Sequence, residues 1–201
     1  MSMTTEAPPA GRIRAAWVAA HAPVAGVPRW ARITACAVPL TVLPSSVWRI
    51  AACTFHAPIM RGDLGSAPGS SGQPDVPLGL YVIVLSVVSE LLALATVGLV
   101  SAWGEVFPRW IPVMRGRRVP ALFAAVPAAL GAAALTLLWT WMAVSMSLGL
   151  RIDGRPQAAA SPVSVGDWKG LVAVAAYAPL LLWGPLLGAV TISYWRRRRH
   201  G

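Results

Sequence analysis

The pattern of apolar and polar residues divides the chain into four long apolar stretches separated by polar ones. The apolar stretches cover about 33–57, 78–103, 119–149 and 170–195. A helix of roughly 20 apolar residues crosses a hydrocarbon core of about 30 Å, and each stretch is at least that long. The pattern therefore predicts an all-α integral membrane protein with four transmembrane helices.

The polar stretches predict the domain organisation. Residues 1–29 are rich in Ala and Pro and form an N-terminal tail, 30–195 form the four-helix transmembrane domain, and 196–201 form a basic C-terminal tail. The connections over about 58–77 and 151–167 are rich in Gly, Ser and Pro and lack an apolar pattern. Neither connection is expected to form a domain of its own.

Composition supports a membrane environment, because only 12% of the 201 residues are charged. A soluble domain carries about 25% charged residues. The mean hydropathy is +0.62. The formal charge of +10 comes from 16 Arg and a single Lys, Lys169.

The positions of these cations predict the orientation of the helices. Positive charge is high before the first stretch, low over 58–77, high over 104–118, intermediate over 151–169 and high at the C-terminus. Lys and Arg accumulate in cytoplasmic loops. We therefore expect both termini and the 104–118 loop in the cytoplasm, and the protein in the cytoplasmic (inner) cell membrane.

The 104–118 loop is the densest polar segment between two spans. We interpret it as an anchor that orients both neighbouring helices, with docking of a partner as the alternative. The residues of this loop anchor are Glu105, Arg109, Trp110, Arg115, Arg117 and Arg118.

The C-terminal arginines Arg196, Arg197, Arg198 and Arg199 form a lipid-facing basic tail. Near a charged membrane surface each contributes about 1 kcal/mol of attraction to anionic lipid headgroups. The expected partners are thus the lipid bilayer and its anionic headgroups, with a homo-oligomer or a membrane protein partner also open. No nucleic acid is expected, because the chain has no folded basic domain outside the membrane.

Aromatic residues at the ends of the stretches predict an interfacial belt, which includes Trp30, Trp168, Tyr194 and Trp195. Deeper tryptophans are expected to pack between helices; they are Trp139, Trp141 and Trp183.

Arg49 and Glu90 are the only charges well inside the apolar stretches. A charge at the centre of a span costs about 2.5–3.5 kcal/mol on insertion scales and marks a candidate functional site. Arg49 is expected toward the outer end of the first helix, and Glu90 about 10 Å deeper in the second. Three interpretations stay open: a structural pair or two separately satisfied residues, an Arg49 that extends to the interface beside a protonated Glu90, and a site that handles protons or a substrate.

Prolines and glycines add two expectations about the helices. Pro39, Pro44, Pro127, Pro179 and Pro185 can each kink a helix. Gly184 and Gly188, in "GPLLG", suit close helix approach, although chance occurrence in Gly/Ala-rich helices leaves little argument for dimerisation.

The chain contains no nucleophile triad, phosphate-binding loop, zinc cluster or paired carboxylates, so we name no catalytic, cofactor-binding or metal-ligating residue. The sequence favours a non-enzymatic accessory or scaffold component of the membrane. The alternative is a small transporter or permease that uses Glu90 and Arg49, and an intramembrane enzyme ranks below both.

Three segments, "VWRIA", "GLYVIVLSVVSE" and "GLVSAWGEVFPRWIPVMRGRRVP", carry a resemblance to a known family. The chain resembles uncharacterised multi-pass membrane proteins of actinobacteria, Streptomyces-like in composition, over about residues 44–145. The resemblance is sharpest in "WGEVFPRW" and "GRRVP". Since that family has no assigned activity, the resemblance implies fold and location only.

Overall fold

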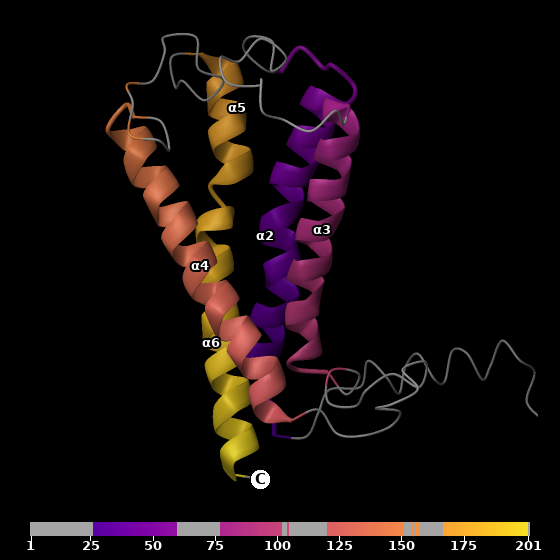
Figure 1. The fold of residues 1–201 in the computed structure, drawn as a ribbon, viewed down its shortest axis with the longest axis vertical. Helices are drawn as coiled ribbons and strands as arrows, with labels where there is room; N and C mark the ends of the chain where they lie inside the picture. The colour runs from indigo at the N-terminus through magenta and orange to yellow at the C-terminus, as the bar shows by residue number, and fades with distance from the viewer. Residues whose placement is uncertain are drawn as a thin grey trace, which may run out of the picture.

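The protein is a bundle of helices in a computed structural model (Figure 1). The structure describes residues 26–59, 77–101, 104, 120–150, 154, 156 and 167–200. The helices are α2 (Arg29–Cys53), α3 (Leu78–Gly98), α4 (Ala121–Ser147), α5 (Trp168–Tyr177) and α6 (Leu180–His200). These described residues include no β-strand, and Leu150 and Pro156 form an isolated bridge.

Four apolar helical segments are long enough to cross a membrane, which confirms the predicted all-α, four-span fold. They are α2, α3, α4 and the combined segment Trp168–Arg199, which contains α5 and α6. The first span ends at Cys53, about four residues before the expected boundary. His56 has a φ of +51°, a left-handed conformation that cannot continue a right-handed helix.

Prolines mark the boundaries of several helices. Pro28, Pro77 and Pro120 immediately precede α2, α3 and α4, where their fixed φ and missing N–H do not disturb the helical hydrogen bonds. Pro179 lies between α5 and α6, so the fourth span is interrupted there as its proline predicted. The other predicted kink sites all lie inside continuous helices; they are Pro39, Pro44, Pro127 and Pro185.

Helix α2 is the centre of the bundle and packs on α3, α5 and α6, while α4 packs chiefly on α6. The buried face of α2 carries small side chains at intervals of three or four residues, including Ala31, Ala35, Val38 and Val42. Such residues allow helix backbones to approach closely in a membrane, where van der Waals contact replaces the hydrophobic effect as the source of helix association.

The "GPLLG" glycines lie at the contact between α4 and α6. A Cβ placed on Gly184 would lie 2.6 Å from the backbone N of Thr136 and 2.9 Å from the carbonyl O of Ala132, so only glycine fits. A Cβ on Gly188 would make an ordinary contact of 3.7 Å with the Ala132 Cβ. The chain thus uses this spacing for packing within one molecule.

The aromatic residues follow the expected belt only in part. Trp30 and Trp168 are exposed near helix ends, and Trp183 is buried in the core, as predicted. Tyr194 lies at the predicted end, yet its ring is 2% exposed and faces the bundle interior. The prediction is wrong for Trp141, which is 54% exposed on the outer surface of α4, because α4 has one main packing neighbour.

Candidate functional site

Arg49 lies in the last turns of α2 and is half-buried. Its Nη2 donates a long hydrogen bond of 3.5 Å to the Ser46 Oγ, which is one helical turn away. Its Nε is buried without a hydrogen-bond partner. Part of the guanidinium therefore has N–H groups without an acceptor, in a region where unpaired polar groups are costly.

Aromatic side chains from three helices pack together beside this part of α2. The Tyr177 ring, at the end of α5, meets the Trp48 ring edge-on at 5.6 Å between centroids and the Trp139 ring of α4 at 6.1 Å. Cys53 is buried in one group of side chains with Trp48, and Tyr177 packs against that group. We call these four residues, together with Arg49, the Tyr177 cluster.

The Tyr177 cluster holds more donors than acceptors. The Trp48 Nε1 and Trp139 Nε1 are both buried without a partner, like the Arg49 Nε. Unpaired N–H groups beside a cation suit a carboxylate or another anion. The cluster also adjoins the interruption at Pro179, and membrane transporters often build binding sites at broken helices.

Glu90 lies deeper, on α3, and its Oε1 is buried without a hydrogen-bond partner. The end of α2 is beside the start of α3, since a Cβ on Gly79 would lie 3.8 Å from the Thr54 Cγ2. Arg49 precedes Thr54 by five residues and Glu90 follows Gly79 by eleven. The six-residue difference places Glu90 about 9 Å further into the bundle, as the sequence predicted.

The structure does not join Arg49 and Glu90. No ion pair links them in the part of the chain that the structure describes, and each keeps a buried polar atom without a partner. The described residues thus show no direct Arg49–Glu90 pair, while Ser46 gives Arg49 one partner of its own.

Serines near these two charges were missed by the sequence analysis. Ser86 is 2% exposed, its Oγ has no partner, and it lies one turn from Glu90 on α3. On α2, Ser45 is fully buried and donates to the Val42 carbonyl at 2.8 Å, while Ser46 accepts from Arg49. The serines next to the charged residue in "LPSSVWR" and "LSVVSE" could have indicated these positions from the sequence.

No protein-family model, curated protein or solved structure matches the chain. The resemblance to actinobacterial membrane proteins stays a prediction, and the functional argument depends on the geometry of the chain itself.

A second polar region lies at the end of the bundle that contains the start of α2 and the end of α6 (Figure 1). We call it the basic end, and its described cations are Arg29, Arg32, Arg196, Arg197, Arg198 and Arg199. The terminal arginines, expected as a tail, continue α6 as helix. Arg197 packs against Gly26, donates to the Leu99 carbonyl at 3.4 Å and lies over the Tyr194 ring at 5.6 Å.

The predicted loop anchor cannot be placed, because all of its residues lie outside the described ranges. They are Glu105, Arg109, Trp110, Arg115, Arg117 and Arg118.

Two further observations limit the chemistry of the described residues. Within the described ranges, no three His, Cys, Asp or Glu side chains gather into a group that could hold a metal ion.

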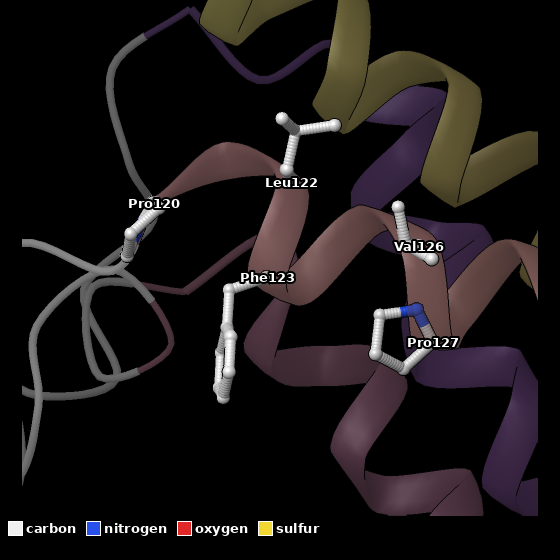
Figure 2. A pocket seen from close by; sticks show the side chains of 5 residues that line it. All are labelled: Pro120, Leu122, Phe123, Val126 and Pro127. Atoms are coloured by element: carbon white, nitrogen blue, oxygen red, sulfur yellow. The ribbon is translucent and has the colours of Figure 1, made fainter.

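An open cavity of about 420 Å³ at the start of α4 is lined by apolar side chains, which Figure 2 shows along two helical turns; they are Pro120, Leu122, Phe123, Val126 and Pro127. A surface without a polar group suits contact with lipid.

Proposed function

We propose that the protein is a multi-pass component of the cytoplasmic membrane, with both termini inside the cell, and that it serves as a non-enzymatic accessory or scaffold protein. The four apolar spans supply the membrane part of this proposal. The orientation of the spans and the accessory role are the two parts that we propose in addition.

The distribution of charge between the two ends supports the orientation. The basic end combines the start of α2 with the last turn of α6, so six of the described arginines lie on one side; they are Arg29, Arg32, Arg196, Arg197, Arg198 and Arg199. At the opposite end, the described charges near the surface are Asp167 and Lys169. The positive-inside rule then places the basic end in the cytoplasm.

The outer surface of α4 carries the proposal of an accessory role. Over its most apolar 18 residues, only 11% of α4 is buried inside the bundle, whereas the corresponding part of α2 is 44% buried. Leu130 and Leu137, seven residues apart and therefore on one face, are 67% and 72% exposed. Since α4 packs chiefly on α6, this face is available to a transmembrane helix of a partner.

The test is affinity purification from membranes in mild detergent, comparing two matched double variants. Leu130→Ala with Leu137→Ala should lose a partner that is stoichiometric with the parent protein. Leu85→Ala with Leu92→Ala, an equally spaced exposed pair on α3, should retain it. The absence of any stoichiometric partner of the parent protein would count against the accessory role.

The unpaired donors of the Tyr177 cluster favour a second candidate function, a small transporter or permease. In this alternative Arg49 binds an anionic substrate beside the Pro179 interruption, and Glu90 handles a proton deeper in the bundle. Glu90→Gln should then abolish proton flux into vesicles that contain the purified protein, while the amount of inserted protein stays normal. A lower protein level as the only effect of Glu90→Gln would favour a structural role for Glu90.

A further inference from the structure

An open groove of about 560 Å³ lies at the basic end, between the start of α2 and the last three turns of α6. Its polar part is formed by Ser193, Arg196 and Arg197 of α6. Its apolar part is formed by Ala189 and Ile192 of α6 and by Trp30 of α2. The groove therefore has two chemically different ends.

The two ends lie at different depths along α6. Ala189 and Arg196 are seven residues apart, which corresponds to about 10 Å along a helix axis. Trp30 is an exposed aromatic residue at the same end, as expected at the level of lipid headgroups. The groove thus extends from the headgroup level into the hydrocarbon, which is how a phospholipid is oriented.

We propose that this groove binds one anionic phospholipid, with the phosphate against Ser193, Arg196 and Arg197, the glycerol region beside Trp30, and an acyl chain along Ala189 and Ile192. The proposal uses the membrane location, and the proposed orientation enters only in assigning the lipid to the inner leaflet. It goes beyond a diffuse attraction of the basic tail, because it assigns different roles to neighbouring arginines.

Charge complementarity selects an anionic lipid. Two arginine side chains line the polar part, and Arg197 is held in place by its bond to the Leu99 carbonyl and its position over the Tyr194 ring. A side chain ordered before binding loses less entropy when the ligand arrives. The N-terminus of α2, which no side chain caps at Pro28, adds the positive end of a 25-residue helix.

The apolar part selects a lipid over a free phosphate ion. Ile192 is 55% exposed and, together with Ala189 and Trp30, offers a surface that inorganic phosphate cannot use. Burial of hydrocarbon is favourable for every CH₂ group removed from water, so an acyl chain adds affinity that the charges alone do not supply.

The main test compares two arginines that are both exposed and differ in their relation to the groove. Arg196 lines it, whereas Arg199 lies over the Trp195 ring at 5.0 Å. Native mass spectrometry of the detergent-purified full chain would measure binding of phosphatidylglycerol. Arg196→Gln should weaken binding about fivefold, the equivalent of about 1 kcal/mol per cation. Arg199→Gln should weaken it less than twofold, and equal losses in the two variants would overturn the proposal.

A second pair of variants tests the apolar part. Ala189→Phe should fill the groove and reduce phosphatidylglycerol binding, whereas Leu182→Phe, on an exposed part of α6 outside the groove, should not. Phosphatidylcholine with the same acyl chains should bind more weakly, and inorganic phosphate should not displace the bound lipid. Undiminished binding by Ala189→Phe, or equal binding of both lipids, would contradict the proposal.

The result is separable from the proposed orientation and role. Binding in detergent does not depend on which side of the membrane holds the termini. A negative result would remove the lipid site and leave the topology intact, whereas a reversed topology would only move the bound lipid to the outer leaflet.

Discussion

At the scale of single residues, Arg49 and Glu90 are the two charges that lie away from the ends of the described apolar spans. Their insertion is costly, and the structure does not offset the cost by pairing them. Arg49 bonds a serine one turn away, Ser46, whereas the Glu90 Oε1 and the Oγ of the neighbouring Ser86 are both without a partner. The two residues are thus separate polar positions at different depths.

This separation predicts that the two residues contribute independently to stability. The effects of Arg49→Gln and Glu90→Gln on the free energy of unfolding should add within about 0.5 kcal/mol in the double variant, as expected for residues without a shared contact. Unfolding in mixed micelles, monitored for the parent, both single variants and the double variant, would measure this. A coupling above about 1 kcal/mol would instead indicate a direct pair.

At the scale of secondary-structure elements, the crossing of α4 and α6 depends on one glycine. Gly184 approaches the backbone of Thr136 and Ala132 too closely for any side chain. Gly188, one turn later, leaves room for a methyl group. Two glycines of one motif therefore have different roles, which their spacing in the sequence does not reveal.

Gly184→Ala and Gly188→Ala should accordingly have different effects on stability. Overpacking in a closely packed contact costs about 1–3 kcal/mol, so Gly184→Ala should lower the free energy of unfolding by that amount. Gly188→Ala should be neutral or slightly stabilising, because Ala has the higher helix propensity and its Cβ makes an ordinary contact. Thermal unfolding of the two purified variants, side by side, would measure the difference. A tolerated Gly184→Ala would mean that α4 and α6 are further apart than the structure shows.

At the scale of the whole molecule, the bundle places the start of the first span and the end of the last span together. Arg197 joins them by its contact with Gly26 and its hydrogen bond to the end of α3. Three spans therefore meet at the basic end, and the fourth, α4, begins there as well (Figure 1). This arrangement concentrates the described positive charge on one surface of the membrane.

The proposed orientation predicts the outcome of reporter fusions. A phosphatase that is active only outside the cytoplasm should be active when joined within 58–77 or 151–167, and inactive when joined within 104–118 or after residue 201. Replacement of Arg115, Arg117 and Arg118 by Asn should reduce this contrast, because those cations are expected to retain the loop inside. An active reporter within 104–118 would reverse the orientation.

The sequence by itself determined the all-α class, the four spans and their approximate limits, because a hydrocarbon solvent makes long uncharged runs unambiguous. It also separated Arg49 from Glu90 in depth, since a helix rises by a fixed distance per residue. Only the tertiary structure decided that the two do not pair, that Trp141 faces outward, and that Gly184 but not Gly188 is indispensable to the α4–α6 contact. Those features depend on which faces of neighbouring helices meet, and in a membrane nearly every face is apolar, so the pattern along the chain does not distinguish them.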